Sequence, residues 1–561
     1  MKKKINLFLF LITLFFYIKV SSEPLNPEIQ PEPTSKFQKN KFSSIYNNFV
    51  VVTANKLATE AGYKILKKGG NAVDAAVTIQ FVLGLVEPQS SGIGGGSFIT
   101  YYDKKTRKII SYEGREKAPR EIEESIFLND NNKPKKFWEA AIGGSSVGVP
   151  GTLKAFFQLH KKFGKLSWNE VLKPVYELAE DGFIPPPRLL NAIKKERFLF
   201  KTNENSIFKK ILKEPEKKFY NYAYANLIKK ISKQPNDFYT GEIAKNIVSV
   251  IKNAPNPGKL SLNDMNSYKP VIQEAFCHVL DSGYKICGPN LPSSGTICVI
   301  QALILFEELI EKNPKIKKPN EFPLVEVLEI LDFIYYLRSI YLGDDEFVDV
   351  NVSSILKKDF LIKNLGIHKQ RNKLTEINNI KELLNSTSHF SVVDSQKNII
   401  SSTSSIESSF GSRLTVSGFF LNNQLTDFSF KLYDSNGELK KNRPQGGKRP
   451  LSSMAPLIIF NKNDEFLLTI GSPGGKAIIS YITRVLIDIL YFGEKPEDSI
   501  NKPNYLSING NIILEKGYKE FTLEKKILFK NLTSGLAIIQ KREDGLLGAV
   551  DKRRDGRVLG Y

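Results

Sequence analysis

The sequence predicts an α+β protein with two structural portions, and three observations support this prediction. The chain has 561 residues, of which 41% are hydrophobic and 25% are charged, so it can bury a substantial core. Cores stop growing beyond roughly 250 to 300 residues, which predicts a division into two portions. Helical patterns recur through the region before Thr387, whereas short strand-like stretches follow it.

The first 22 residues are predicted to be a secretory signal. Several lysines precede a mostly apolar run from Ile5 to Val20, which Asn6, Thr13 and Lys19 interrupt, and two serines follow. An uncleaved membrane anchor is the alternative interpretation. No other stretch reaches the roughly 18 uninterrupted apolar residues that a membrane span needs. We therefore expect an exported protein, either periplasmic or extracellular.

Two helices and a strand are predicted near the start of the mature chain. Leu57, Ala61 and Ile65 recur every four residues, as in a helix with one apolar face, and a glycine pair then stops the pattern. The next helix begins after Asn71, a favourable N-cap residue, and ends by Pro88. A glycine-rich stretch then leads into the alternating sequence SFITYYD, which predicts a strand.

The middle and the C-terminal part of the chain differ in pattern. Residues 155–270 have a polar, lysine-rich helical pattern, and residues 284–309 predict a strand, a loop and a buried helix. Residues 365–386 are polar and are expected to be loose. After Thr387, the stretches SHFSVVD and IISSTSS predict a hairpin, in whose turn Asn398 is expected to adopt the left-handed conformation.

Composition argues against several classes of function. The net charge is +21, but the lysines are spread along the chain without an aromatic and basic stripe, so we expect no nucleic-acid partner. Four scattered histidines argue against a zinc site. Cys277, Cys287 and Cys298 do not make a disulfide framework, although one disulfide and one buried free thiol are compatible with an exported chain.

Three short motifs resemble functional signatures but lack the required context. GSSVG fits a nucleophile elbow at Ser146, with His278, His368 or His389 as base, yet no buried strand precedes it. GSPGGKA is one residue short of a phosphate-binding loop and carries Ala477 where a magnesium-binding hydroxyl belongs. GIGGG follows a helix and lacks the last glycine of a dinucleotide-binding motif. We therefore favour glycine-rich turns at all three places.

Eight motifs, in the same order along the chain, resemble those of γ-glutamyltransferases. They are GNAVDAAV, EPQSSGIGGGSF, GREKAP, TSHFSVVD, FFLNNQLTDFS, KRPLSSMAP, GSPGGK and the terminal DKRRDGRVLGY. The resemblance runs from about residue 48 to the end of the sequence. It implies an N-terminal nucleophile hydrolase fold with four layers, αββα, in which helices cover two sheets.

The resemblance also implies that the precursor cleaves itself between Ser386 and Thr387. The expected parts are a signal or anchor at 1–22, a large subunit at 23–386 and a small subunit at 387–561, which form a heterodimer. Thr387 then becomes an N-terminal nucleophile. Its own α-amine, with an ordinary pKa of roughly 7.7 to 8.0, can serve as the base, so no histidine is needed.

Matching positions carry the other expected site residues. Ser405 stands where the family has a hydroxyl, normally a threonine, that bonds the nucleophile, and Gly474 and Gly475 match the amides of the oxyanion hole. The residues implied to hold the substrate α-carboxylate are Arg115, Ser452 and Ser453. Asp427 is implied to hold the substrate α-amino group, and Glu407 and Gln424 match further contacts to the amino-acid end of the glutamyl group.

The implied activity is γ-glutamyl transfer from glutathione or related γ-glutamyl amides to water or to an amino acid or peptide amine, without a cofactor or a metal. Two alternatives are an acylase of the glutaryl or cephalosporin type and a non-catalytic binding homologue, both with the same fold. Two departures from the family concern acceptor choice and a lid. Thr426 stands where the family often has an acid, and Tyr433 lies in the lid stretch without a firm match.

Overall fold

The computed structural model describes residues 42–196, 198–202, 206–316, 318–372, 386–434, 436–518 and 527–561. The predicted signal segment lies outside these residues, as does most of the stretch that was expected to be loose.

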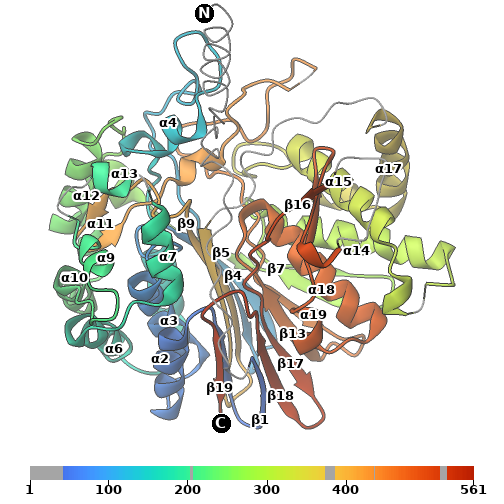
Figure 1. Ribbon diagram of the computed structural model, residues 1–561, viewed down its shortest axis with the longest axis horizontal. Coiled ribbons are helices and arrows are strands. Elements are labelled where there is room, and N and C mark those ends of the chain that lie inside the picture. The colour runs from blue at the N-terminus through green and yellow to red at the C-terminus, as the bar shows by residue number, and fades with distance from the viewer. Residues whose placement is uncertain are drawn as a thin grey trace, which may run out of the picture.

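Two seven-stranded antiparallel sheets form the centre of the molecule (Figure 1). The first sheet contains, in spatial order, β19 (Arg557–Gly560), β2 (Val50–Thr53), β8 (Ser386–Val393), β9 (Ile399–Glu407), β3 (Gly96–Asp103), β4 (Lys108–Gly114) and β5 (Val271–Glu274). The second contains β1 (Ser43–Tyr46), β18 (Gly545–Val550), β17 (Ala537–Arg542), β13 (Phe466–Gly471), β12 (Leu457–Phe460), β7 (Lys285–Gly288) and β6 (Phe276–Val279).

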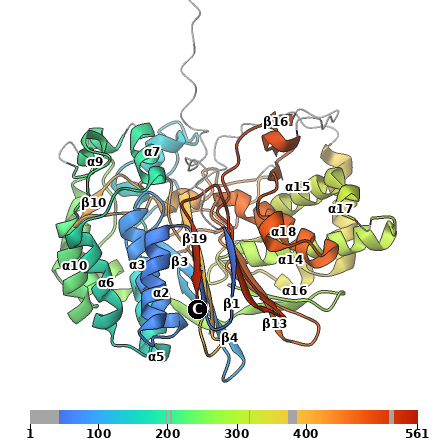
Figure 2. The same cartoon turned by 60° about the horizontal axis from the view of Figure 1, so that its bottom comes forward.

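Helices lie on both outer sides of the paired sheets (Figures 1 and 2). On one side are α2 (Lys56–Lys67), α3 (Ala72–Val86), α5 (Thr152–Phe163), α6 (Trp168–Asp181), α7 (Pro187–Lys195), α9 (Lys209–Lys213), α10 (Tyr222–Lys233), α11 (Asp237–Thr240), α12 (Glu242–Lys252) and α13 (Leu262–Ser267). The short helix α4 (Phe137–Ala141) lies at the top of Figure 1, and α8 (Leu199–Thr202) follows α7 in the chain. On the other are α14 (Ser294–Lys312), α15 (Leu324–Tyr341), α16 (Val352–Ile355), α17 (Lys358–Asn372), α18 (Ile478–Phe492) and α19 (Pro496–Ser499).

Smaller elements complete the described chain. They are the pair β10 (Thr415–Val416) and β11 (Phe419–Phe420), the three strands β14 (Tyr505–Ile508), β15 (Asn511–Leu514) and β16 (Ile527–Phe529), and the 3₁₀ turns η2 (Gly144–Ser146), η3 (Pro319–Glu321), η4 (Gln424–Asp427), η5 (Gly475–Ala477) and η6 (Lys516–Tyr518).

Side-chain alternation along the strands creates the layers. In β2, Val51 belongs to the core shared with α2 and α3, whereas Val50 and Val52 pack in a core between the two sheets. Ile458 and Ile539 of the second sheet complete that inner core. Successive strand residues point to opposite faces, so each sheet buries both faces. The order helix, sheet, sheet, helix confirms the predicted four-layer αββα fold.

The two predicted N-terminal helices are confirmed, and the N-cap at Asn71 explains where α3 begins. The Asn71 side chain accepts hydrogen bonds from the N–H groups of Val73 and Asp74, both at 3.0 Å. Asp74 accepts in return from the Asn71 N–H at 2.9 Å, which completes a capping box. Every residue of α3 is buried, so this helix is part of the core behind the first sheet.

The β8–β9 hairpin is present, but the expectation for Asn398 is wrong. Lys397 has the positive φ, 65°, and its Nζ donates to the carbonyl oxygens of Asn47 and Asn48. Asn398 instead donates from its Nδ2 to Asp394 Oδ2 at 3.0 Å. These contacts hold the turn in a conformation that places the lysine, not the asparagine, in the left-handed region.

The prediction that residues 365–386 are loose is wrong for its first part. Residues up to Asn372 belong to α17, and the rest, apart from Ser386, lie outside the described residues. His368 explains the order, because its buried ring contacts Asp332 at 3.0 Å and packs beside the Tyr336 ring at 4.8 Å between centroids. The polar composition of this stretch gave no indication in the sequence that His368 would contact α15.

The three cysteines divide as one pair and one buried thiol. Cys277 of β6 and Cys287 of β7 lie opposite each other in the second sheet and form a disulfide. Cys298 is a buried free cysteine in α14. Within the part of the chain that the structure describes, no helix is both long and apolar enough to cross a membrane.

Candidate active site

Thr387 is the second residue of β8, a central strand of the first sheet. Its side chain is 2% exposed. The pairing with β9 shifts at this point, because Ser386 lies opposite Glu407 while Thr387 lies opposite Ser405. Such a bulge changes the direction of side chains next to it. The pairing of β8 with β9 is therefore irregular at the start of β8, where the predicted cleavage bond lies.

One serine links the predicted nucleophile to the predicted cleavage bond. Ser405 Oγ donates to the carbonyl oxygen of Ser386 at 2.7 Å and accepts from Thr387 Oγ1 at 3.3 Å. It also accepts from the N–H of Glu407 at 2.9 Å. These contacts orient the Ser405 hydroxyl so that its only hydrogen points at the Ser386 carbonyl, which polarises that carbonyl.

The residues on either side of Thr387 point the opposite way. Ser388 Oγ donates to Glu87 Oε2 at 2.9 Å, and Ser386 Oγ contacts Ser90 Oγ at 3.1 Å. The carbonyl oxygen of Thr387 accepts from Arg554 Nη1 at 3.1 Å. The hydroxyl groups of Ser386, Thr387 and Ser388 therefore form hydrogen bonds on both faces of β8. None of the three residues caps a helix or forms a turn.

A small cavity of about 40 Å³ opens beside Thr387. Its lining residues are Arg338, Thr387, Ser405, Glu407, Gln424, Asp427, Leu451, Ser452, Ser453, Met454, Gly475, Lys476 and Ile478. Most of the residues that the sequence analysis assigned to the site therefore meet here. They come from the end of β9, the turn η4, the segment before β12 and the turn η5 before α18.

Arg115 and Gly474, which were also assigned to the site, do not line the cavity. Arg115 is 1% exposed and its Nη2 donates to Asp427 Oδ2 at 2.7 Å. Its Nε donates to the carbonyl oxygen of Pro450 at 2.9 Å. The sequence analysis expected Arg115 and Asp427 to hold different charged groups of a substrate, whereas in this structure the two side chains pair with each other.

The acidic residues of the cavity have different surroundings. Asp427 Oδ2 also accepts from Gln424 Nε2 at 2.6 Å. Burial, reinforced by the charge of Asp427, raises the pKa of Glu407 to about 8. Burial likewise raises the pKa of Glu116, behind Arg115, to about 8. These two carboxyls with raised pKa values therefore lie on either side of the ion pair between Arg115 and Asp427.

The glycine turn η5 provides unused backbone donors. Gly474 has φ 132° and Gly475 has φ 55°, a region that other residues rarely adopt. A Cβ on Gly474 would lie 2.6 Å from the Tyr481 ring. Among the backbone hydrogen bonds of the described residues, none uses the N–H of Gly474 or Gly475. The turn thus places Gly475 at the edge of the cavity, with Gly474 directly before it in the chain.

The rejected elbow motif has no catalytic surroundings. Ser146 Oγ donates to the carbonyl oxygens of Ala141 and Gly143, and a helix rather than a strand precedes it. His389 contacts Thr403 Oγ1 at 2.9 Å, and burial lowers its pKa to about 3. Tyr433, in the expected lid stretch, is 56% exposed and does not line the cavity.

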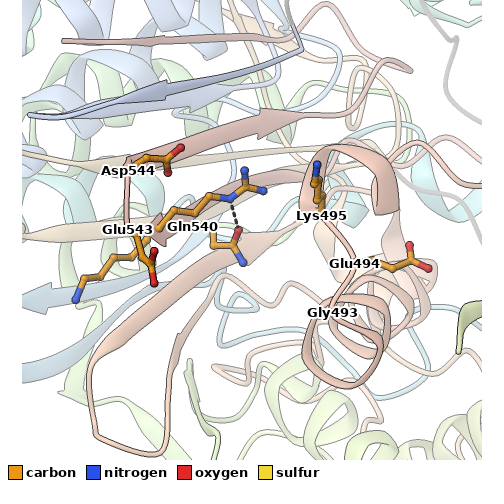
Figure 3. Close-up of a pocket in the computed structure, with 8 residues that line it drawn as sticks. Gly493, Glu494, Lys495, Gln540, Glu543 and Asp544 are labelled. Atoms are coloured by element: carbon orange, nitrogen blue, oxygen red, sulfur yellow. Dashed lines mark hydrogen bonds between the residues drawn. The ribbon is translucent and has the colours of Figure 1, made fainter. Parts of the chain in front are cut away.

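Two other features of the described residues do not add to the site. No group of three or more His, Cys, Asp or Glu side chains is arranged there to hold a metal ion. Figure 3 shows a larger open groove of about 590 Å³ between the β17–β18 turn and the segment after α18. This groove shares no lining residue with the cavity at Thr387. Arg542, which lines the groove, donates hydrogen bonds to the side chains of Gln540 and Glu497.

Sequence reasoning missed Arg338, which reaches the cavity from α15. An arginine near the end of a helix with many apolar residues is an ordinary surface feature in a single sequence. The signal in the sequence is that Arg338 follows the hydrophobic side chains of Tyr335 and Leu337, both of which are buried in the structure.

Comparisons with known proteins identify the family of the chain. The family model described as gamma-glutamyltranspeptidase matches residues 58–561. A glutathione hydrolase proenzyme of Bacillus subtilis is 32% identical, and the alignment covers 96% of each chain. A cephalosporin acylase of Bacillus halodurans has the same fold, with a TM-score of 0.76, 20% identity and coverage of 95% of this chain and 99% of that chain.

A solved gamma-glutamyltranspeptidase of Pseudomonas nitroreducens is 29% identical with a TM-score of 0.52, and the match covers 56% of this chain and 92% of that chain. The family model covers far more than half of the sequence, and the Bacillus subtilis relative is aligned over almost its whole length. The chain therefore belongs to the gamma-glutamyltranspeptidase family.

Proposed function

We propose that this protein cleaves itself before Thr387 and then transfers or hydrolyses γ-glutamyl groups from glutathione and other γ-glutamyl amides. The observation that carries the proposal is the position of Ser405, whose hydroxyl contacts both Thr387 Oγ1 and the carbonyl oxygen of Ser386. The cavity beside them has a carboxylate, Asp427, suited to an amino group.

Self-cleavage begins with attack by Thr387 Oγ1 on the carbonyl carbon of Ser386. The peptide C–N bond breaks, the Thr387 nitrogen gains a proton, and an ester joins Ser386 to the threonine oxygen. Ser405 donates a hydrogen bond to the oxygen on which negative charge develops. Water then hydrolyses the ester, which leaves a carboxylate on Ser386 and a free α-amine on Thr387.

The donor substrate is held by its two charged groups. Its α-amino group is bound by Asp427, with Glu407 and Gln424 beside it. Its α-carboxylate is bound by Ser452 and Ser453, and Arg115 supplies positive charge behind Asp427. These contacts direct the γ-carbonyl carbon toward Thr387 and its oxygen toward the N–H groups of Gly474 and Gly475.

Acyl transfer takes place in two steps. The α-amine of Thr387 accepts the hydroxyl proton as Oγ1 attacks the γ-carbonyl, and the donor amide leaves as an amine that takes up that proton. A γ-glutamyl ester on Thr387 remains. Water or the amine of an amino acid or peptide then attacks this ester, and the threonine hydroxyl is restored.

Export and a two-subunit product belong to the same proposal. The N-terminal sequence has the lysines, apolar run and small residues of a secretory signal, with a retained anchor as the alternative. The disulfide between Cys277 and Cys287 suits an oxidising compartment outside the cytosol. The expected mature protein is a heterodimer of residues 23–386 and 387–561.

Intact-mass measurement with a γ-glutamyl anilide assay tests the proposal. Wild-type protein should give two chains that divide at Ser386–Thr387 and should release the anilide. Thr387→Ala should remain one chain and be inactive, while Thr387→Ser should cleave slowly because it keeps a hydroxyl. Two subunits of normal mass from Thr387→Ala would contradict the proposal.

A further inference from the structure

Arg338 is a cation in the cavity that forms no ion pair with any carboxylate among the residues that the structure describes. It lies in the last turn of α15, and its side chain lines the same cavity as Thr387 and Asp427. Its Nε donates to Ser294 Oγ at 2.8 Å. No ion pair joins it to a carboxylate in the described part of the chain. The terminal nitrogens of its guanidinium therefore remain available to a ligand.

Three arginines that are buried elsewhere in the protein are neutralised by carboxylates. Arg188 pairs with Glu87 at 3.0 Å, Arg413 with Glu196 at 3.0 Å, and Arg449 with Asp344 at 2.6 Å; these pairs lie outside the cavity. A guanidinium held away from water without a partner is costly, so an unpaired one facing a cavity indicates an anionic ligand.

Arg115 has few donors left for such a ligand. Its Nη2 contacts Asp427 and the carbonyl oxygen of Leu451, its Nε contacts Pro450, and its Nη1 lies 3.5 Å from Glu116. A two-pronged contact with a carboxylate requires parallel N–H groups on one edge of the guanidinium. Arg115 would have to release Asp427 to provide them, whereas Arg338 would not.

Helices α14 and α15 support the two loops of the cavity. Ser294, the partner of Arg338, donates from its Oγ to the carbonyl oxygen of Ser452 at 2.6 Å. One turn before Arg338, the Tyr335 hydroxyl donates to the carbonyl oxygen of Lys476, next to Gly475. The arginine is thus fixed relative to the serine pair and to the glycine turn.

We propose that Arg338 is a second carboxylate-binding arginine, which contacts the α-carboxylate of the donor together with Ser452 and Ser453. This inference rests on the proposed γ-glutamyl activity. With Asp427 on the amino group and Arg338 on the carboxylate, each charge of the zwitterionic donor meets an opposite charge. Donors without an α-carboxylate gain nothing from Arg338.

Three anilide donors separate this role from a structural one. The γ-glutamyl anilide has both charged groups, the glutaryl anilide lacks the amine, and the 4-aminobutyryl anilide lacks the α-carboxylate. Arg338→Gln should lower kcat/KM for the first two by about 10- to 100-fold, as expected for loss of a charged hydrogen bond, and leave the third within about threefold. Arg338→Lys should restore part of the loss.

The matched control is Arg107→Gln, which removes an exposed arginine that pairs with Asp464 and should leave all three donors unchanged. Intact mass should show normal cleavage in every variant, because cleavage requires no donor. An equal loss on all three donors, or no loss on the γ-glutamyl anilide, would overturn the inference. A wild-type protein without γ-glutamyl activity would instead overturn the proposed function, and the inference with it.

Discussion

The two ends of the cavity differ in the polar groups that they present. The end at Thr387 consists of hydroxyls and backbone amides, with Ser405 between the threonine and the Ser386 carbonyl. At the opposite end, Asp427 lines the cavity and pairs at 2.7 Å with Arg115, which lies behind it. Bond cleavage and substrate recognition are therefore assigned to separate sets of residues.

This difference has a chemical reason. In the proposed mechanism, the new N-terminus of Thr387 brings its own base, so no ionised side chain is needed to accept the hydroxyl proton. Charged groups at that end would have to be desolvated and would shift the pKa of the α-amine. At the recognition end, a zwitterionic donor requires one charge of each sign. Substitutions at one end should therefore affect self-cleavage, and those at the other only the use of substrate.

The largest effect is expected from Ser405→Ala. This change removes the donor at 2.7 Å from the Ser386 carbonyl, and loss of one oxyanion donor costs about 100- to 1000-fold in rate. Self-cleavage, followed by intact mass over time, should slow by that factor. The control is Ser404→Ala, on the opposite face of β9, whose Oγ has no hydrogen-bond partner among the described residues. Equal cleavage rates in the two variants would contradict the role of Ser405.

A smaller effect, confined to recognition, is expected from Asp427→Asn. The substitution keeps the shape but removes the charge, and a charged hydrogen bond contributes about 1.5 to 3 kcal/mol. The preference for γ-glutamyl over glutaryl anilide should fall by about 10- to 100-fold, while cleavage continues. Equal rates on the two anilides in the wild-type protein would show that Asp427 does not recognise the amine and would favour an acylase.

Arg115→Lys should cost less, about tenfold in kcat/KM for the γ-glutamyl anilide, because the charge beside Asp427 remains. The loss arises because an ammonium cannot reach Asp427 and the carbonyl oxygens of Pro450 and Leu451 together. Intact mass should show complete cleavage. Wild-type kinetics in this variant would mean that Arg115 has no part in recognition, and failure to cleave would mean that its role is structural.

The sequence predicted the layers and most of the cavity, and the exceptions have physical reasons. Thr387 and Asp427 were identifiable because each lies in a short motif whose order along the chain is fixed, and Ser405 because its position between two of these motifs matches a hydroxyl of the family. Arg338 was not, because its environment depends on α15 packing against loops that are distant in sequence. The pairing of Arg115 with Asp427 was missed for the same reason, since a motif specifies residue types and not which of them meet.

The smallest expected effect concerns pH and Glu407, which lies between the two ends of the cavity. Burial, followed by the charge of Asp427, raises the pKa of Glu407 to about 8, so this carboxyl is neutral at pH 7. It ionises as the pH rises through 8, which adds a negative charge beside the donor amine. The KM for the γ-glutamyl anilide should therefore fall by about threefold between pH 6.5 and 8.

The control for this prediction is Glu407→Gln, whose side chain cannot ionise. Its KM relative to that of the wild-type protein should rise over the same pH range. Comparing the two proteins at each pH cancels the titration of the donor and of the Thr387 amine. A constant ratio of the two KM values would show that Glu407 does not change its charge near the donor.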